Sequence, residues 1–281
     1  MKTRMPALFA AGTLALSLAA CGSEALEEET TNEAAAEAEE NGGGGVLDLI
    51  SGLGEKTRSV DNYTLDMSMH MPDPDLGDID MTMTFEVMDD PSASKVTMVM
   101  PFLGESLLEL AQLGGANPDL TAEELGTAIL IVPAEGEALV SNHNETHGVD
   151  TPWARGVQDT DMFAPEEMFD IGTLSDITGA FAGIEQMEEA GSEEVSGVAT
   201  TLVEGTMTSE DIEALEAEQK QAVEDLLGGV EGTVDVSLWI DDSGFPMRLD
   251  FSDEKADISM VFSKLGETSF EIPGEDEITD L

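Results

Sequence analysis

Methionine occupies every second position in three neighbouring stretches of the chain. These stretches read LDMSMHM from Leu65 to Met71, MTMTFEVM from Met81 to Met88 and KVTMVM from Lys95 to Met100. Thioether sulfur is a soft ligand that suits Cu(I), and Met-x-Met spacing places two sulfurs on one side of a strand. The same alternation turns His70 to the opposite side, where it cannot join Met69 and Met71. An apolar face is therefore the favoured interpretation, with Cu(I) binding as the alternative.

Methionine is an informative choice for such a face. A tightly specified core prefers Leu, Ile and Val, whereas the unbranched thioether adapts to irregular or changing contents. A concave face lined with methionine suits flexible acyl chains. Loose core filling beneath helices is an equally open interpretation of the same pattern.

Two histidines in HNETH, His143 and His147, have the i, i+4 spacing of a zinc site. The glutamate of this stretch does not stand where His-Glu-x-x-His requires it, and the surrounding residues indicate a loop. The aspartates of DPDLGDID and DDSG lack the glycine and closing glutamate of a calcium loop and are typical of solvated turns. We therefore expect no metal site and no cofactor.

Catalytic motifs are missing from the sequence as well. It contains no nucleophile elbow or phosphate-binding loop, and its only cysteine is Cys21. Its 61 Asp and Glu residues are so frequent that proximity in sequence selects no acid–base pair. The sequence therefore predicts a binding protein and not an enzyme.

The first twenty residues have the features of an export signal. Lys2 and Arg4 precede an apolar run, Met5 to Ala20, that is shorter than the ~20 residues needed to cross a bilayer. The run ends in Leu18-Ala19-Ala20-Cys21, which looks like the lipobox of bacterial lipoproteins, whose cysteine takes a diacylglycerol. An ordinary signal peptide with an incidental cysteine is the alternative. We expect lipidation of Cys21, with two acyl chains that anchor the protein on the extracytoplasmic face of the cell membrane.

Residues 22–45 are rich in acidic residues, alanine and glycine, which predicts a disordered tether with a reach of ~25–30 Å. The formal net charge of −51 excludes nucleic acid as a partner and disfavours anionic headgroups. Any lipid would be met tail-first or through a neutral patch. We attribute the acidity itself to solubility, for example at high external salt, and expect a monomer.

Residues 46–281 have the length of one domain. A helical stripe comes first, made of Val46, Leu47, Leu49, Ile50 and Leu53. Alternating apolar and polar residues then predict strands from Tyr63 to Met71, Ile79 to Val87, Lys95 to Met100, Ala128 to Val132 and Glu137 to Asn142. A polar loop leads from there into TPWARG.

Helices and strands alternate again in the second half. The predicted helical stripes are Leu174, Ile177, Phe181, Ile184 and Met187, and Ile212 to Leu227 with Ser209 as its cap and Gly228 as its end. The predicted strands are VSGVATTLVEGTMT, TVDVSLWID, MRLDFS, DISMVFSKLG and SFEIP. Short-turn meanders with helices between them favour an α+β fold, a curved antiparallel β-sheet or half-barrel whose concave apolar face is covered by helices.

The lipobox, the tether, the first helix and the order of elements over residues 46–281 resemble the actinobacterial LppX/LprAFG-type lipoproteins and their LolA/LolB-like relatives. The specific matches are Thr151-Pro152-Trp153 and the Trp-x-Asp-x-x-Gly-x-Pro-x-Arg stretch from Trp239 to Arg248. The resemblance implies a half-barrel closed by helices around a hydrophobic cavity, in a protein that binds or carries acylated lipid. It implies a cavity lined by Leu65, Met67, Met69, Met81, Met83, Phe85, Met98 and Met100. We place Trp153 and Arg155 at its mouth. The acidity and methionine content of this chain depart from that group.

The sequence as a whole predicts a signal peptide at residues 1–20, a lipidated tether at 21–45 and a LolA-like ligand-binding domain at 46–281. Its predicted function is to bind a hydrophobic, acylated lipid, with a carrier role between envelope sites and helices that part to admit the chains. A sensory or regulatory module that binds a protein partner with its helices packed down is the first alternative. A Met-rich Cu(I)-binding protein is the second.

Overall fold

The computed structural model describes residues 50, 53, 56–57, 59–73, 77–114, 119–157, 171–181, 184, 187–227 and 232–281. The predicted signal peptide, Cys21 and the tether lie outside this part, as do Val46, Leu47 and Leu49. Ile50 and Leu53 of the predicted first helix are helical and buried in the core. None of the helices in the described part is long and apolar enough to cross a bilayer.

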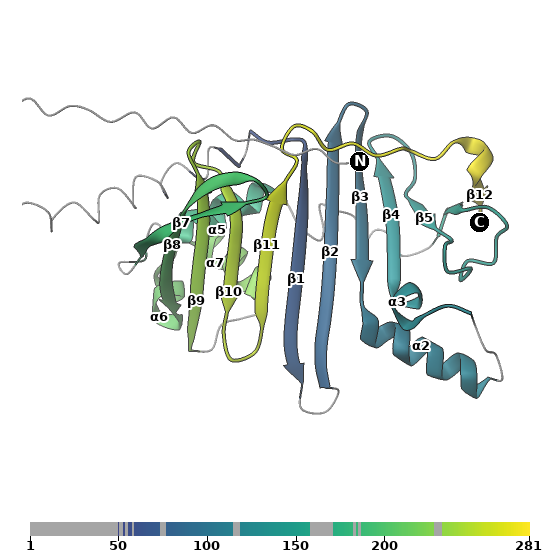
Figure 1. Cartoon of the computed structure of the whole chain (residues 1–281), viewed down its shortest axis with the longest axis horizontal. Helices are drawn as coiled ribbons and strands as arrows, with labels where there is room; N and C mark the ends of the chain where they lie inside the picture. Colours follow the sequence, from purple (N-terminus) through teal and green to yellow (C-terminus); the bar gives the residue numbers. More distant parts are fainter. Residues whose placement is uncertain are drawn as a thin grey trace, which may run out of the picture. The chain divides into compact units, whose positions relative to one another are not determined.

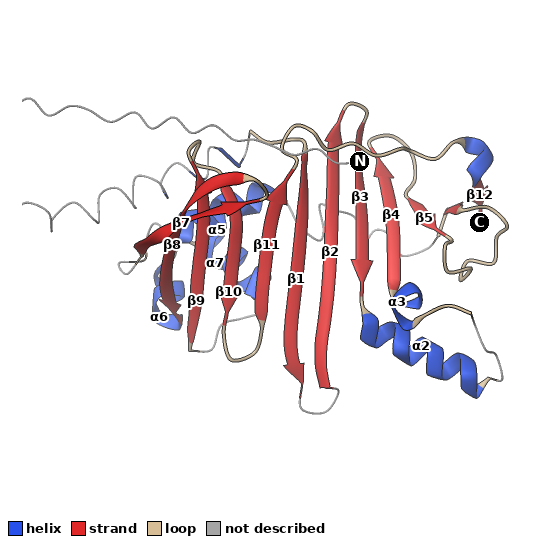
Figure 2. Ribbon diagram, viewed as in Figure 1, coloured by secondary structure: helices blue, strands red, loops and turns tan. Residues whose placement is uncertain are grey.

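One sheet dominates the described residues (Figures 1 and 2). Its strands are β1 (Tyr63–Asp73), β2 (Gly77–Asp89), β3 (Ser92–Val99), β4 (Thr127–Pro133), β5 (Leu139–Ser141), β6 (Trp153–Arg155), β7 (Glu188–Val195), β8 (Val198–Thr208), β9 (Thr233–Asp241), β10 (Pro246–Ser252), β11 (Asp257–Ser263) and β12 (Ile278–Asp280). Their order in space is β12-β6-β5-β4-β3-β2-β1-β11-β10-β9-β8-β7, and every neighbouring pair is antiparallel except β12 with β6. The sheet is curved and unclosed, so the predicted half-barrel of the α+β class is confirmed.

Strand alternation divides this sheet into an apolar and a polar face. Leu65 is paired with Phe85 on β2 and with Phe262 on β11, and all three side chains are buried. We call the face that carries them the inner face. The intervening side chains of β1, such as Asp66 and Ser68, are exposed on the outer face.

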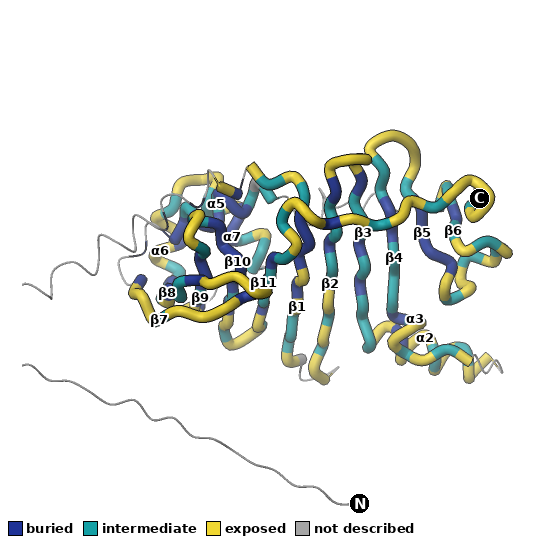
Figure 3. Tube along the Cα trace, turned by 45° about the horizontal axis from the view of Figure 1, so that its top comes forward, coloured by how far each residue is buried: buried dark blue, intermediate teal, exposed yellow. Residues whose placement is uncertain are grey.

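Three helices cover the inner face over one half of the sheet. They are α5 (Ile171–Phe181), α6 (Ser209–Ala214) and α7 (Ala217–Leu227). Leu174, Ile177 and Phe181 of α5 and Val223 of α7 belong to the same buried cluster as the inner-face residues of β8 to β11. The ring of Phe181 lies 5.9 Å from that of Phe251 on β10. The predicted cover of helices is therefore confirmed for this half, where Figure 3 shows a concentration of buried chain.

The second predicted helix is in fact two helices with a break at Leu215 and Glu216. Its cap is Thr208 and not Ser209. The Thr208 hydroxyl accepts a hydrogen bond from the Asp211 amide, and the Asp211 carboxylate accepts one from the Thr208 amide. Ser209 is the first helical residue, and its hydroxyl bonds the Gly232 backbone instead.

Other elements differ from the prediction as well. The stretch before Val198 forms a separate strand, β7, with a turn at Ser196 and Gly197. SFEIP is not a strand, and the described C-terminal segment ends in the short strand β12. Trp153 to Arg155 form strand β6. Two helices that the sequence reasoning did not anticipate, α2 (Pro101–Leu113) and α3 (Ala122–Leu125), connect β3 to β4.

Candidate functional site: an apolar pocket beside a methionine row

The predicted methionine set lies on the inner face, in rows that cross the strands. Met67 on β1 pairs with Met83 on β2, which pairs with Met98 on β3, and Met260 of β11 pairs with Met67 from the other side. We call these four residues the methionine row. Their side chains are between 0% and 8% exposed. The prediction that the alternating methionines share one apolar face is therefore confirmed.

On β1 to β3, the inner-face side chains are less buried towards the strand ends that lie at the bottom of Figure 1. Leu65 and Phe85 are 0% and 1% exposed and, with Met67, Met83 and Met98, belong to the packed core. Met69, Met81 and Met100 are partly buried against that core. The structure therefore brings the predicted set together on one face, and its most accessible members lie at the ends of the strands.

His70 lies on the other face, as the alternation predicted. Its Nδ1 is 2.8 Å from a carboxylate oxygen of Asp80 on β2, and this hydrogen bond raises the pKa of His70 above 6.5. The described residues contain no group of three or more His, Cys, Asp or Glu side chains placed to hold a metal ion. His143, the first histidine of HNETH, bonds the hydroxyl of Ser141 through its ring.

An apolar pocket of about 240 Å³ opens on the inner face beside the methionine row. Its floor is formed by Ala128 and Leu130 of β4 and Val140 of β5. Ala128 is the pairing partner of Met98, so the pocket directly adjoins the end of the row. We call it the α2 pocket, because α2 forms one of its walls.

The walls of the α2 pocket come from both helices between β3 and β4. Met100, at the N-terminus of α2, lines it together with Leu103 and Leu107 of α2 and Leu125 of α3. Of the predicted ligand-binding residues, Met100 alone lines this pocket among the described residues. The three leucines had no role in the prediction, although their spacing, with Leu103 and Leu107 one helical turn apart, could have indicated a helix face.

Two close backbone approaches fix the wall in place. A Cβ atom at Gly104 would lie 1.6 Å from the carbonyl oxygen of Ala122, and one at Gly126 would lie 2.3 Å from that of Met100. Only glycine allows the backbones of α2 and α3 to meet at these distances. Gly126 also accepts a hydrogen bond from the Met100 amide at 2.9 Å. The two helices are thus joined to each other and to the ends of β3 and β4.

Helix α3 has a well-formed start. The Thr121 amide and hydroxyl both donate to the Glu124 carboxylate at 2.8 Å, and the Glu124 amide donates back to the hydroxyl. These bonds to the charged form lower the pKa of Glu124. Such a capping box stabilises the four-residue helix that presents Leu125 to the pocket.

A polar loop forms the remaining side of the α2 pocket. Asn144, Thr146 and His147 line it. The loop is held by the buried side chain of Asn142, which donates to the carbonyl oxygen of Val149 at 2.8 Å and accepts from the His147 amide at 3.1 Å. The pocket therefore combines an apolar floor and wall with a polar rim, an arrangement suited to a ligand with one apolar and one polar part.

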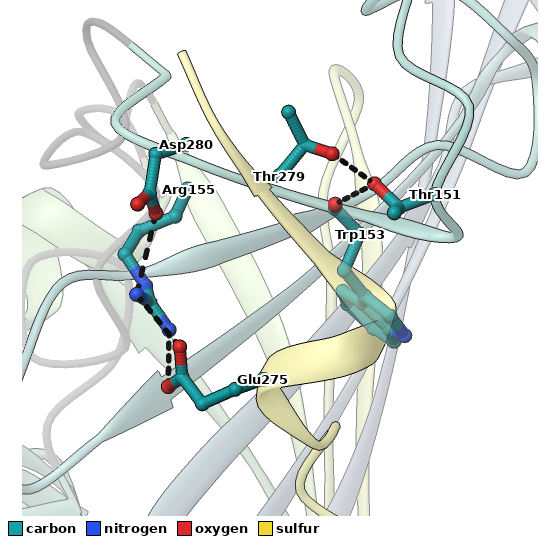
Figure 4. Close-up of polar contacts among 6 residues, drawn as sticks. All are labelled: Thr151, Trp153, Arg155, Glu275, Thr279 and Asp280. Carbon is teal, nitrogen blue, oxygen red and sulfur yellow. Dashed lines mark hydrogen bonds and ion pairs between the residues drawn. The ribbon is translucent and has the colours of Figure 1, made fainter.

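Trp153 and Arg155 do not lie with the methionine row. Between them, Ala154 is buried and pairs with inner-face Val140, so strand alternation places both residues on the outer face. Figure 4 shows their surroundings, where Arg155 meets the carboxylates of Glu275 and Asp280 at 2.8 and 3.2 Å. These contacts tie β12 to β6. A ligand contact for Trp153 stays a prediction.

The Trp-x-Asp-x-x-Gly-x-Pro-x-Arg stretch forms a hairpin with an outer-face cluster. The guanidinium of Arg248 lies 4.4 Å from the ring centroid of Trp239, whose indole nitrogen donates to Glu193 on β7 at 2.9 Å. The Asp241 side chain accepts from the amides of Ser243 and Phe245 and closes the turn. The motif therefore stabilises the β9–β10 hairpin, and DDSG is a turn as predicted.

No family model and no curated protein matches the chain. The solved structures that match it include lipoprotein LppX from Mycobacterium tuberculosis (16% identity, TM-score 0.44, 80% of this chain and 97% of that chain). They also include LprF from Mycobacterium bovis (12%, 0.44, 82% and 96%) and a LolA superfamily protein from Nitrosomonas europaea (10%, 0.25, 80% and 94%). The matches thus include the lipoprotein group and the LolA-type relatives that the sequence resembles.

Proposed function

We propose that the protein is a non-enzymatic lipoprotein of the cell envelope, anchored through Cys21, that binds an acylated lipid by its hydrocarbon chains in the α2 pocket. The observation that carries the proposal is this pocket, with its floor of Ala128, Leu130 and Val140 and its polar rim. Each methylene group moved from water into such a site contributes ~0.8 kcal/mol, so a segment of eight contributes ~6 kcal/mol. Release of water from the chain is the driving force.

The volume of the pocket limits how much of a lipid it can hold. Its volume of about 240 Å³ is below the ~300–1,000 Å³ of typical ligand sites. We infer that the pocket takes the end of one acyl chain, and that longer chains extend towards Met98 as flexible methionine side chains rearrange. The headgroup then stays beside Asn144, Thr146 and His147. A net charge of −51 favours an uncharged or zwitterionic headgroup.

The first test is the lipid content of the protein. A Cys21→Ala form purified from its own host is examined by native mass spectrometry, and we expect a bound lipid of defined mass. The unchanged protein should be found in the membrane fraction and the Cys21→Ala form in the soluble fraction. Protein that is empty in every preparation would count against lipid binding. A membrane protein partner captured without lipid would support the sensory alternative.

The second test places the ligand. A neutral diacylglycerol with a fluorescent acyl chain is titrated into the Cys21→Ala form and into a further variant, Ala128→Phe, which fills the floor of the pocket. We expect the affinity to fall about 10-fold or more. Thr97→Phe is the matched control, because Thr97 lies on the outer face of β3, next in sequence to Met98. Equal loss in both variants would place the ligand elsewhere.

A further inference from the structure

Helix α2 exposes an unusual amount of apolar surface. Eight large hydrophobic side chains are exposed among the described residues, and five of them lie on this helix: Phe102, Leu103, Leu107, Leu110 and Leu113. The exposed fraction is 38–40% at Phe102, Leu103 and Leu107, and it reaches 64% at Leu110 and 85% at Leu113 near the end of the helix. Concentrated exposure of this kind marks an interaction surface, whereas single exposed apolar residues are ordinary.

The five side chains lie on one side of the helix, and we call them the apolar arc. Leu103, Leu107 and Leu110 follow the i, i+4, i+7 spacing of a single helix face. Phe102 and Leu113, about three turns apart, both lie along one edge of that face. The opposite side of the helix carries Gly104, which is buried against α3. Figure 1 shows α2 leaving the end of β3 and running past the end of β4.

The arc and the α2 pocket share residues. Leu103 and Leu107 belong to both, because each lines the pocket and remains more than a third exposed. Apolar side chains therefore extend from the tip of α2, through Leu103 and Leu107, to the pocket floor at Ala128. A hydrocarbon chain that followed this path would stay out of water.

The charge around the arc indicates which kind of partner could bind it. Residues 101–126 contain no Lys or Arg, and their charged residues are Glu105, Glu109, Asp119, Glu123 and Glu124. A second copy of this chain would bring the same acidic rim against it, and an anionic membrane would also be repelled. The uncharged interior of a zwitterionic bilayer meets no such repulsion. The 49 residues that precede the described part carry Cys21, whose anchoring would keep that domain within reach of a bilayer.

We propose that α2 inserts its apolar arc into the outer part of a zwitterionic bilayer and thereby places the mouth of the α2 pocket against the hydrocarbon. The inserted leucines of α2 form the route by which an acyl chain passes between membrane and pocket. This route rests on the proposed function, whereas insertion of the helix does not depend on it.

The test measures binding of the Cys21→Ala form to phosphatidylcholine vesicles by flotation, so that no acyl anchor contributes. The variant is Leu110→Gln with Leu113→Gln, which removes the most exposed part of the arc and leaves the pocket lining intact. We expect vesicle binding to fall about 10-fold or more. Leu281→Gln is the matched control, because Leu281 is 61% exposed, follows the edge strand β12 and does not lie on α2. It should bind as the parent does.

Further measurements distinguish membrane insertion from the alternative explanations. Vesicles that contain phosphatidylglycerol should bind more weakly and recover with added salt, since the repulsion is screened. The double variant should still bind the fluorescent diacylglycerol, and Ala128→Phe should still bind vesicles. If vesicle binding fails in the parent or survives in the double variant, the insertion is overturned. A dimer in analytical ultracentrifugation that the double variant dissociates would also overturn it, in favour of a second copy.

Discussion

Met67 and Met83 face each other across β1 and β2 as directly paired residues, with exposed fractions of 5% and 8%. Their neighbours Met98 and Met260 continue the row over two further strands. The unbranched side chains of four adjacent methionines can change conformation more easily than branched side chains can. We therefore expect the row to adapt its shape where it meets the α2 pocket, at Met98 and Ala128.

Replacing these methionines with Leu or Ala distinguishes the effect of side-chain volume on stability from a specific role of the sulfur atom. Met67→Leu and Met83→Leu should each change the free energy of unfolding by less than ~1.5 kcal/mol, because the volume is conserved. Met83→Ala should cost ~2–5 kcal/mol through the cavity that it leaves. Urea unfolding of the Cys21→Ala form measures both. Met71→Ala, at a partly exposed position near the end of β1, is the control and should cost less than ~1 kcal/mol. A leucine as costly as an alanine would point to a specific role of the sulfur.

Substitution of Gly104 tests the close packing of α2 against α3. Gly104→Ala places a methyl group 1.6 Å from the backbone oxygen of Ala122, which no side-chain movement can relieve. We expect a loss of ~1–3 kcal/mol in unfolding free energy, together with weaker binding of the acyl probe as the wall shifts. Thermal or urea unfolding and the probe titration are the measurements.

Gly114 is the matched control for this substitution. It follows the same helix with φ −74°, and its nearest contact would be the Ala111 oxygen at 3.4 Å. Gly114→Ala should be neutral or should stabilise the protein by up to ~1 kcal/mol. Equal losses for the two glycines would contradict the close approach of α2 and α3.

The strands of the first half could be predicted because each carries a clear period of two. Tyr63 to Met71 and Ile79 to Val87 alternate without interruption, and burial follows that alternation from Leu65 to Ser68 and from Ile79 to Phe85. β7 could not be found in this way, since in Glu188 to Val195 only the last residue is buried and the remainder is mostly charged. Its strand character comes from pairing with β8, which is a tertiary effect.

The candidate site was predicted only in part, for a related reason. Periodicity assigned the methionines to one face, but it does not say whether that face packs against helices or lines a space. The helix that forms the pocket wall was missed because its apolar residues are exposed and Gly104 interrupts its pattern, although Pro101 is favourable at a helix start. Trp153 illustrates the same limit, because its face depends on the register of β6 with β5.

The ion pair of His70 and Asp80 should be visible in the titration of the histidine. The Asp80 hydrogen bond raises the pKa of His70 above 6.5, with smaller contributions from the charges of Asp78 and Asp257. Because the folded pKa exceeds the unfolded one, this pair stabilises the fold below pH 6.5 and loses its effect as the pH rises through the folded value. NMR titration of the ring protons reports the pKa directly. Asp80→Asn should lower it clearly.

Asp78→Asn is the control for this titration, because Asp78 acts on His70 through charge alone. It should lower the pKa less than Asp80→Asn does. The signal is assigned with His70→Gln, since the chain contains three histidines. An unchanged pKa in Asp80→Asn would contradict the contact.

Arg155 on β6 forms ion pairs with Glu275 and with Asp280 of β12. Its replacement should weaken the attachment of β12 to β6. Its guanidinium donates to Glu275 at 2.8 Å and to Asp280 at 3.2 Å, while β12 itself pairs with β6 over only three residues. Arg155→Gln removes both ion pairs and should increase hydrogen exchange of the β12 amides about 10-fold or more, with β1 unchanged. Hydrogen-exchange mass spectrometry measures the two segments in one sample.

The pH dependence of the same exchange tests the cause. Hydrogen bonds from Arg155 lower the pKa of Glu275 below its ordinary 4.5, so the ion pair contributes above that value and is lost as the pH falls through the folded pKa. Protection of β12 in the parent should therefore decline in acid after correction for intrinsic exchange, whereas Arg155→Gln should show no such step. Lys220→Gln, which breaks the 3.7 Å contact with Glu224 on α7, should leave β12 unaffected. If β12 stayed protected in Arg155→Gln, backbone pairing with β6 and the Thr151–Thr279 hydrogen bond at 2.7 Å would be sufficient to hold it.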